Sequence, residues 1–537
     1  MKKIFLGLLL LPFLILSCEG ILDKQPLDQI SETTFWESPQ DAVAGLNACY
    51  DALQTIGDSK NLCDELMGML DCLTPVGNSR DANTAAIANG NVDPTNNRIY
   101  QWWTAHYRGI VRCNDFLDHI EGIEFPSNDA GKKERMTAEV RFLRAFYYFQ
   151  LVDYFGDVPL IMHMQKLQES QVPRNSKDEI ITAMLEDLNN AIGKLPASYP
   201  PADAGHATSG AAKTLKLKYQ MMIKDFAAAA VTAKEIMDTP GYNLLNNYPA
   251  VFSHTNENNA EVIFDIQFIS FVGDGSSFDK LWGNRSASAN GWSWIHPTLW
   301  LIDKFERIDP NPGYEIKDKR IPAEIYNYFE GRDPRMDWTI VRPGAYFTDN
   351  NGKAQLYPYQ IKNYAHSQTG MHLRKNVIEG PDGIADDSPG NWIIFRLADV
   401  MLLYAEAKTQ STYSGGALVT DPNICKAIND IRKRASDKLP LYTIGTLTKE
   451  AMLERIYDER IRELAFEGWL TSDLKRWKRL ELNSGLQVRG LTINNTKVSF
   501  SAAPIVVRDF KAHYYTWPIP QSEIDVNPKL IQTTGYN

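Results

Sequence analysis

Apolar residues recur at helical spacing through the first 240 residues and again after residue 390. Within each of these segments they stand three or four positions apart, which is the signature of a helix with one buried face. The spacing predicts helices near residues 38–53, 97–120, 133–155, 177–195, 209–223, 225–237, 391–410, 422–435 and 449–466. We therefore expect a mostly α-helical protein.

Two of these helices, 209–223 and 225–237, follow each other with almost no loop and carry many alanines. Small side chains let two antiparallel backbones approach closely, and such a pair is the unit of tetratricopeptide-like folds. No regular period of 34 residues accompanies it. The pattern favours a tetratricopeptide-like scaffold of irregular helix pairs.

Helical spacing is lost between residues 240 and 390, where Gly, Pro, Asn and Ser become frequent. A short strand-like run at residues 261–266 is the main regular element expected there. Long loops carried by a rigid scaffold commonly hold the functional groups of a protein. This loop-rich region is therefore expected to face the ligand.

Charged residues alternate along the last predicted helix: Glu454, Asp458, Glu459 and Glu463 with Arg455, Arg460 and Arg462. Acidic and basic side chains three or four positions apart commonly form ion pairs on an exposed helix surface. We expect that arrangement here.

Composition limits the class of protein. The chain has 537 residues, 44% hydrophobic and 11% aromatic, which is ample for a folded core. The net charge is −10 and no basic run is present, so nucleic acid is not an expected partner. Because no Gly/Ser-rich or Pro-rich linker divides the chain, residues 33–537 are expected to form one compact body. Within it we expect an N-terminal helical part (33–239), the loop-rich region (240–390) and a C-terminal helical part (391–537).

The N-terminus has the pattern of a bacterial lipoprotein signal. Lys2 and Lys3 precede an apolar run that is too short to span a bilayer, and the run ends at Ser17-Cys18. We expect cleavage after residue 17, acylation of Cys18 and attachment to a membrane by its acyl chains. Residues 18–32 are then a tether. The remaining five cysteines are odd in number, and the sequence assigns no disulfide among them.

Tryptophans gather in the loop-rich region. Trp282, Trp292 and Trp294 lie among Gly, Ser, Asn and Arg, including Asn284 and Arg285. An exposed indole offers a flat apolar face and one N–H donor, which suits the apolar face and the hydroxyls of a sugar. These five residues are the first candidates for a ligand site, although tryptophans can equally pack loops onto a scaffold.

A polar loop at residues 78–83 supplies two more candidates. Arg80 offers a forked donor and Asp81 an acceptor, and both could line the same site. The alternative is an ordinary solvated loop.

Signatures of enzymes are weak. The sequence contains no HExxH or GxSxG motif, and the Gly273–Phe278 segment lacks the lysine of a phosphate loop. No cofactor is expected. A calcium ion is conceivable at Asp382, Asp386 and Asp387, but their spacing does not match an EF-hand.

Several segments together resemble the SusD/RagB family of outer-membrane nutrient-uptake lipoproteins. They occur in the family order along most of the chain. The segments are residues 33–36 (TTFW), 141–149 (RFLRAFYYF), 154–160 (YFGDVPL), 333–336 (DPRM), 396–407 (RLADVMLLYAEA), 459–468 (ERIRELAFEG), 473–477 (DLKRW) and 517–520 (WPIP). Residues 470–472 (LTS) depart from the family pattern.

The resemblance implies a non-catalytic protein that captures a nutrient at the surface of the outer membrane, and a glycan is the nutrient expected. It also implies a partner, a SusC-like TonB-dependent β-barrel transporter that receives the nutrient. The family motifs carry no binding residues, so the candidate site rests on Trp282, Asn284, Arg285, Trp292, Trp294, Arg80 and Asp81. Alternatives are a peptide or metal-chelate ligand, a glycosidase with two facing carboxylates, and a purely structural helical adaptor.

Overall fold

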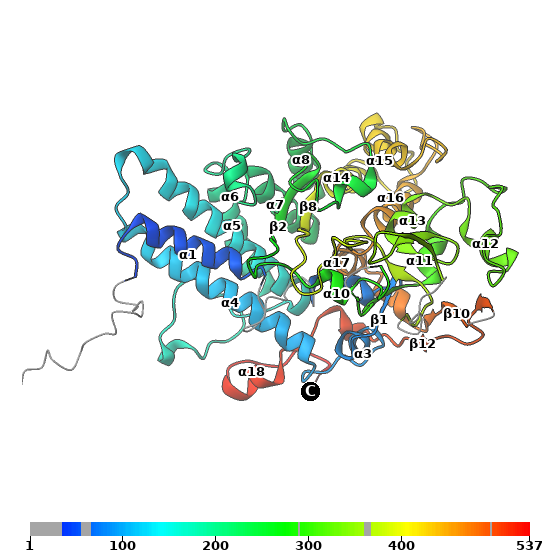
Figure 1. The fold of residues 1–537 in the computed structure, drawn as a ribbon. Coiled ribbons are helices and arrows are strands. Elements are labelled where there is room, and N and C mark those ends of the chain that lie inside the picture. The colour runs from blue at the N-terminus through cyan, green and yellow to red at the C-terminus, as the bar shows by residue number, and fades with distance from the viewer. Residues whose placement is uncertain (1–34, 55–65, 288–289, 359–366, 495–496, 537) are drawn as a thin grey trace, which may run out of the picture.

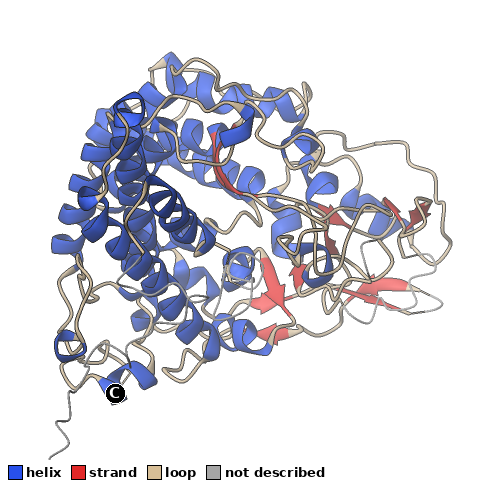
Figure 2. Ribbon diagram, turned by 60° about the vertical axis from the view of Figure 1, so that its left-hand side comes forward, coloured by secondary structure: helices blue, strands red, loops and turns tan. Residues whose placement is uncertain are grey.

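The computed structural model describes residues 35–54, 66–287, 290–358, 367–494 and 497–536. Helices gather on one side of the molecule, while the strands and most long loops lie on the other (Figure 2). In the described part of the chain, no helix has both the length and the apolar character needed to cross a membrane. Residues 1–32, with Cys18 and the expected signal and tether, lie outside the described residues.

The helical side is built from long helices that pack against their neighbours in sequence (Figure 1). Packing runs from α4 to α5, α6, α7 and α8, and then from α8 to α14, which contacts both α15 and α16. The helices are α1 (Pro39–Asp51), α3 (Ala82–Ala88), α4 (Asn97–His119), α5 (Ala130–Phe155), α6 (Lys177–Ile192), α7 (Ser209–Met222), α8 (Phe226–Met237), α14 (Leu397–Thr412), α15 (Pro422–Ala435), α16 (Lys449–Leu464), α17 (Leu470–Arg476) and α18 (Gln521–Val526). This arrangement confirms the mostly α, tetratricopeptide-like fold class.

Local sequence explains where these helices begin. Ser38 and Asp41 form a reciprocal capping box at the start of α1, and Ser176 and Glu179 do the same for α6. Between α7 and α8, Asp225 caps the second helix by accepting a hydrogen bond from the backbone N–H of Ala228. The alanines predicted to allow close approach are largely buried inside the pair.

The loop-rich side contains short elements. They are β1 (Gly77–Ser79), α9 (Tyr248–Val251), β2 (Val262–Ile266), α10 (Phe278–Leu281), β3 (Ile295–Pro297), α11 (Leu299–Lys304), α12 (Ala323–Phe329), α13 (Arg335–Thr339), β4 (Ile340–Val341), β5 (Tyr346–Thr348), β6 (Ala354–Leu356), β7 (His372–Leu373), β8 (Trp392–Arg396), β9 (Gln487–Val488), β10 (Leu491–Ile493), β11 (Val498–Phe500) and β12 (Val506–Val507). The strands form antiparallel pairs, β1–β3, β2–β8, β4–β7, β5–β6, β9–β12 and β10–β11.

Strand β8 corrects one expectation. Residues 391–396 were expected to begin a helix, but Trp392–Arg396 form a strand paired with β2, and α14 starts only at Leu397. All five side chains of β8 are buried. Its first four residues are a continuous apolar run, and periodicity alone does not separate such a buried run from the first turns of a buried helix.

One hydrophobic core runs through both sides. Its cluster of buried residues extends from Ala42 in α1 to Leu530 near the C-terminus, and it includes β2, β8 and α10. Cys49, Cys72, Cys113 and Cys425 lie buried with free thiols, and burial raises the pKa of Cys72 and Cys113. The loop-rich side is therefore packed onto the helices through shared apolar side chains.

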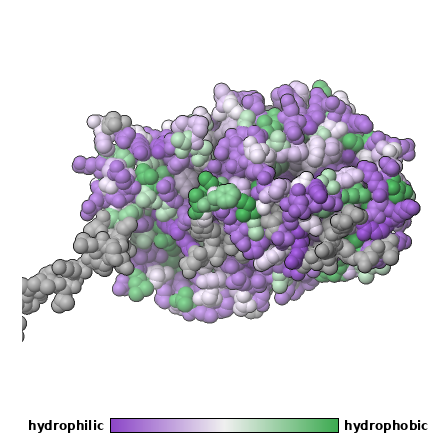
Figure 3. Space-filling view, in the orientation of Figure 1, coloured by the Kyte–Doolittle hydropathy of each residue, from purple (hydrophilic) through white to green (hydrophobic). Residues whose placement is uncertain are grey.

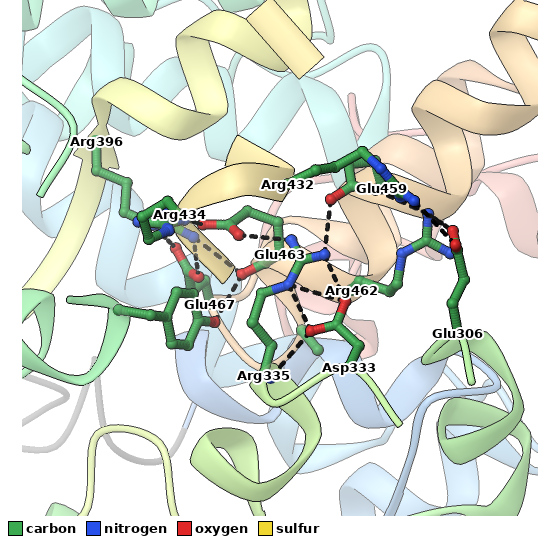
Figure 4. A network of polar contacts seen from close by, with 12 residues as sticks. Glu306, Asp333, Arg335, Arg396, Arg432, Arg434, Glu459, Arg462, Glu463 and Glu467 are labelled. Carbon is green, nitrogen blue, oxygen red and sulfur yellow. Dashed lines mark hydrogen bonds and ion pairs between the residues drawn. The ribbon is translucent and has the colours of Figure 1, made fainter. Parts of the chain in front are cut away.

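Helix α16 corrects a second expectation. Glu459, Arg460, Arg462 and Glu463 are buried instead of lining an exposed helix face. Their partners come mostly from other elements, so the charges form a buried network that joins α16 to α13, β8, α14 and α15 (Figure 4). Among the charged residues named in the prediction, the structure shows one ion pair within α16, between Arg462 and Glu459 at 2.8 Å.

Three arginines surround the carboxylate of Glu463. Arg335 of α13 lies 2.9 Å away, Arg396 of β8 lies 2.7 Å away, and Arg434 of α15 also contacts it. Burial by itself would raise the pKa of Glu463, but the three guanidinium groups outweigh it and lower this pKa to about 2. The network therefore fastens α13, β8 and α15 to α16 through charges that stay ionised.

Candidate functional site

The two loops singled out in the sequence lie side by side because β1 pairs with β3. Asn78 is opposite His296, and Ser79 is opposite Ile295. Just beyond this pair, the backbone N–H of Arg80 donates a hydrogen bond to the carbonyl of Trp294 at 3.0 Å. The structure thus brings the 78–83 loop and the tryptophan-bearing loop to one edge.

Trp292 presents an indole at this edge, with 43% of its surface exposed. Three contacts hold it: the ring centroid of Trp294 is 5.8 Å away, the Lys280 ammonium lies 4.7 Å from the indole centroid, and the Trp292 carbonyl accepts from Arg80 Nη1 at 3.4 Å. An exposed ring in a fixed position loses little conformational freedom when a ligand stacks on it. Trp292 is the best-placed stacking group among the predicted residues.

Trp294 is half-buried beneath Trp292, and a charged pair supports it. The guanidinium of Arg98, from α4, lies 5.7 Å from its ring centroid. Arg98 in turn donates two hydrogen bonds of 3.1 Å to Asp81. Partial burial would raise the pKa of Asp81, but its bonds with Arg98 outweigh that effect and lower this pKa.

Asp81 therefore has a positioning role. Besides holding Arg98, it caps α3 by accepting hydrogen bonds from the backbone N–H and the hydroxyl of Thr84, each at 2.8 Å. Its oxygens are already used inside the protein. We assign Asp81 to the support of Trp294 rather than to direct ligand contact.

Trp282 and Asn284 were predicted to contact ligand, and the structure contradicts both predictions. The Trp282 indole is completely buried, with its ring 4.5 Å from Phe278 and 5.2 Å from Trp392. It packs so closely on Gly68 that a Cβ there would come within 1.8 Å of the indole. The Asn284 side chain is buried too and accepts hydrogen bonds from the backbone N–H groups of Ser286 and Ala287. Both side chains pack inside the loop and stabilise its conformation.

Arg80 and Arg285 are both exposed. Arg80 lies directly beside Trp292, as described above. Arg285 lies on the same loop as Trp292, which closes on itself where the Ser293 N–H donates to the Gly283 carbonyl at 3.0 Å. Of the predicted residues, Arg80, Trp292 and Trp294 thus contact one another at the surface, with Trp294 partly covered, and Arg285 is exposed on the loop that carries Trp292.

Lys280 belongs to the site and was missed in the sequence. Its ammonium group lies over Trp292 and also pairs with both oxygens of Asp386, at 2.7 and 2.8 Å. A single lysine in a short helix such as α10 carries no distinguishing signal in sequence. The pair links the tryptophan loop to the acidic turn at residues 381–387.

A second exposed aromatic group was also missed. Phe271 is 86% exposed, and its neighbours Ile269 and Val272 are 57% and 70% exposed. Asp387 holds their turn by accepting hydrogen bonds from the backbone N–H groups of Phe271 and Gly275. The face seen in Figure 3 is mostly hydrophilic with small apolar patches, so three exposed apolar side chains in one fixed turn are unusual for a soluble surface.

The acidic turn is occupied by protein contacts. Asp386 pairs with Lys280, and Asp387 holds the Phe271 turn, which leaves Asp382 exposed beside them. Among the residues that the structure describes, no three His, Cys, Asp or Glu side chains are grouped to hold a metal ion. The turn connects the two aromatic surfaces, Phe271 and Trp292, through adjacent aspartates.

Comparison with known proteins adds independent evidence. A family model described as "SusD family" matches residues 260–536, and one described as "Starch-binding associating with outer membrane" matches residues 22–216. A SusD-like protein of Formosa agariphila is 28% identical, with 97% of this chain and 96% of that protein covered. The starch-binding protein SusD of Bacteroides thetaiotaomicron is 26% identical, over 80% of this chain and 76% of that protein. The crystal structure of a SusD-like carbohydrate binding protein from Bacteroides fragilis matches with a TM-score of 0.78 and 28% identity, over 93% of this chain and all of that one.

These matches bear on two expectations. The starch-binding and carbohydrate-binding proteins among these matches confirm the expectation of a non-catalytic chain. The family matches cover both the helical and the loop-rich side, in agreement with the resemblance seen in the motifs. The chain belongs to the SusD family.

Proposed function

We propose that this protein captures a glycan on the surface formed by Trp292, Trp294, Arg80, Arg285 and the Phe271 turn. The observation that carries the proposal is the exposed Trp292 indole, held between Trp294, Lys280 and Arg80. A sugar ring can stack on the indole while its hydroxyl groups accept hydrogen bonds from the neighbouring arginines. The starch-binding and carbohydrate-binding relatives support this ligand class.

Two carboxylates beside Trp292 and Trp294 are occupied by contacts within the protein. The acidic groups near Trp292 are already paired, Asp81 with Arg98 and Asp386 with Lys280. Hydrogen-bonding groups and an aromatic face therefore remain as the means of recognition. That combination can orient a polyhydroxylated ligand.

We propose further that the protein works at the outer membrane and passes the glycan to a SusC-like TonB-dependent transporter. Acylation of Cys18 would anchor the body there through residues 18–32. Membership of the SusD family and the outer-membrane description of the second family model support this placement. Copurification of a β-barrel transporter with the lipidated protein from detergent-extracted outer membranes tests the partner, with a Cys18→Ala variant as the control for anchoring.

Affinity electrophoresis tests the ligand. The protein would be run in gels that contain a panel of soluble polysaccharides, beside a Trp292→Ala variant and a Phe500→Ala control. Phe500 is also an exposed aromatic residue, but it belongs to the β10–β11 hairpin, where it packs on Tyr328. We expect one glycan to retard the protein and the control, and the Trp292→Ala variant to bind at least about tenfold more weakly, a difference of roughly 1.4 kcal/mol.

Two results would contradict this proposal. Retardation by no glycan would point to a peptide or chelate ligand. Equal retardation of the Trp292→Ala variant would place the glycan elsewhere on the molecule.

A further inference from the structure

A large groove runs along α4, away from the candidate glycan site. Its volume is about 800 Å³, and its walls are α4, the loop at residues 159–172 and the C-terminal segment around α18. The last two walls are joined by hydrogen bonds, from Gln171 Nε2 to the Val526 carbonyl at 3.2 Å and from Asn527 Nδ2 to the Val172 carbonyl at 2.9 Å. The groove is thus a fixed feature of the fold.

Exposed apolar side chains surround this groove. Val111 of α4 is 44% exposed, Leu167 is 85% exposed and Val526 is 67% exposed, and all three line the groove. Met164, three residues before Leu167, is 42% exposed. Apolar groups gathered in this way on a groove indicate a surface that is covered in the working protein.

The described chain begins beside the same helix. Trp36 stacks on His119 at 5.3 Å and packs edge-on against Phe116 at 5.8 Å, both at the C-terminal end of α4. At this end, Asp118 also accepts a hydrogen bond from the Met164 N–H at 2.7 Å. Apolar contacts can therefore continue from Trp36 past Met164 and Leu167 into the groove.

The preceding residues have the length and chemistry to fill it. Residues 19–34 contain Ile21, Leu22, Leu27 and Ile30 in an otherwise polar stretch. Val111 is eight residues from His119 along α4, or about 12 Å at 1.5 Å per residue. Ile30 is five residues before Phe35, which allows a reach of roughly 17 Å in an extended chain.

We propose that residues 27–34 of this chain dock in the groove along α4, with Leu27 and Ile30 against Leu167, Val111 and Val526. The docked segment buries apolar surface at both partners, which is the driving force for the contact. It also shortens the free tether from residues 18–34 to residues 18–26. At about 3.5 Å per residue, this reduces its maximum reach from roughly 60 Å to about 30 Å. The groove would thereby keep the body close to the point at which residue 18 is held.

Disulfide trapping in the full-length protein tests the docking. Ile30→Cys would be combined with Leu167→Cys, and as a matched control with Glu121→Cys. Glu121 lies two residues after α4, at the end where Trp36 packs, and its side chain is 80% exposed. We expect the disulfide between positions 30 and 167 to form at least fivefold faster than the disulfide between positions 30 and 121. Peptide mass spectrometry measures both rates. Equal rates, or disulfides between separate molecules instead of within one, would overturn the proposal.

A second measurement uses trypsin, because Lys24 lies just before the proposed docked segment. Leu27→Asp together with Ile30→Asp, or Leu167→Asp together with Val526→Asp, should speed cleavage after Lys24 at least fivefold. The control pair Ile21→Asp and Leu22→Asp lies outside the docked residues and should leave the rate near that of the unchanged protein. Unchanged cleavage in both test pairs would contradict the docking. Glycan retardation should be the same in all these variants, so failure of this proposal is separate from failure of glycan binding.

Discussion

Individual tryptophans in the same loop have opposite roles. Trp282 is buried against Phe278, Trp392 and Gly68, whereas Trp292, ten residues later, is held at the surface. The sequence indicates that the loop is rich in tryptophan, but it does not indicate which indole faces solvent. The exposure of each indole depends on contacts with residues far away in sequence, such as Gly68 and Trp392. Phe271 was missed for the same reason, since its exposure is set by Asp387, more than a hundred residues away.

Replacement of these two tryptophans should separate stability from binding. Trp282→Ala leaves a large cavity in the core, so we expect the free energy of unfolding to fall by about 3–5 kcal/mol. Trp292→Ala removes a partly exposed ring, so its effect on stability should be below about 1.5 kcal/mol while glycan binding is lost. Denaturant titration of both variants measures the difference. A Trp292→Ala variant that is as unstable as Trp282→Ala would mean that Trp292 is a structural residue.

His106 gives a prediction for pH. It is fully buried in α4, its Nδ1 lies 2.6 Å from the Trp102 carbonyl, and burial lowers its pKa to about 4. Because the unfolded chain binds this proton near pH 6.5 and the folded chain only near pH 4, stability should fall as the pH is lowered through that window. The slope for this group is at most about 1.4 kcal/mol per pH unit.

The matched variant for this prediction is His106→Gln, which lacks the titrating ring. Its stability at pH 7 can differ for packing reasons, so the slope between pH 6.5 and 4 is the quantity to compare. We expect a shallower slope in urea titrations at several pH values. Parallel slopes for the two proteins would show that His106 does not titrate in this way.

At the scale of elements, the bounds of most helices could be predicted well, but the burial of a charged helix face could not. The bounds expected for α4 and α15 agree closely with the structure, because each carries a clear apolar stripe. For α16 the charged pattern indicated an exposed face, and the structure buries that face against β8, α13 and α15. Burial of a charge depends on counter-charges far away in sequence, which periodicity does not report.

The network on α16 predicts unequal effects for two glutamates of the same helix. Glu463 is buried among three arginines, so Glu463→Gln leaves buried guanidinium groups short of a counter-charge and should destabilise the protein by about 3–5 kcal/mol. Glu454 is exposed and pairs with Arg479, so Glu454→Gln should change stability by less than about 1 kcal/mol. Thermal unfolding of the two variants measures this. Similar melting temperatures of the two variants would contradict the prediction that the buried charge network stabilises the protein.

At the scale of the whole molecule, the helical and loop-rich sides share one core and one buried charge network. Proteins of this length often contain domains that unfold separately. Here we expect a single calorimetric transition whose van't Hoff and calorimetric enthalpies agree. Two resolved transitions, or loss of the Trp292 surface before the helices melt, would show that the loop-rich side is an independent unit.

The buried charge network also limits the order in which parts of the chain can fold during synthesis. Arg335 lies 128 residues before Glu463, its counter-charge on α16, and Arg396 lies 67 residues before it. Until α16 has been synthesised, Arg335 has only Asp333 and Arg396 only Glu261 as a buried counter-charge, and their contacts with Glu463 are missing. Contacts between such distant residues form slowly. We therefore expect the loop-rich side to reach its final shape only after α16 has been made, although more than a hundred residues of the chain follow that side in sequence.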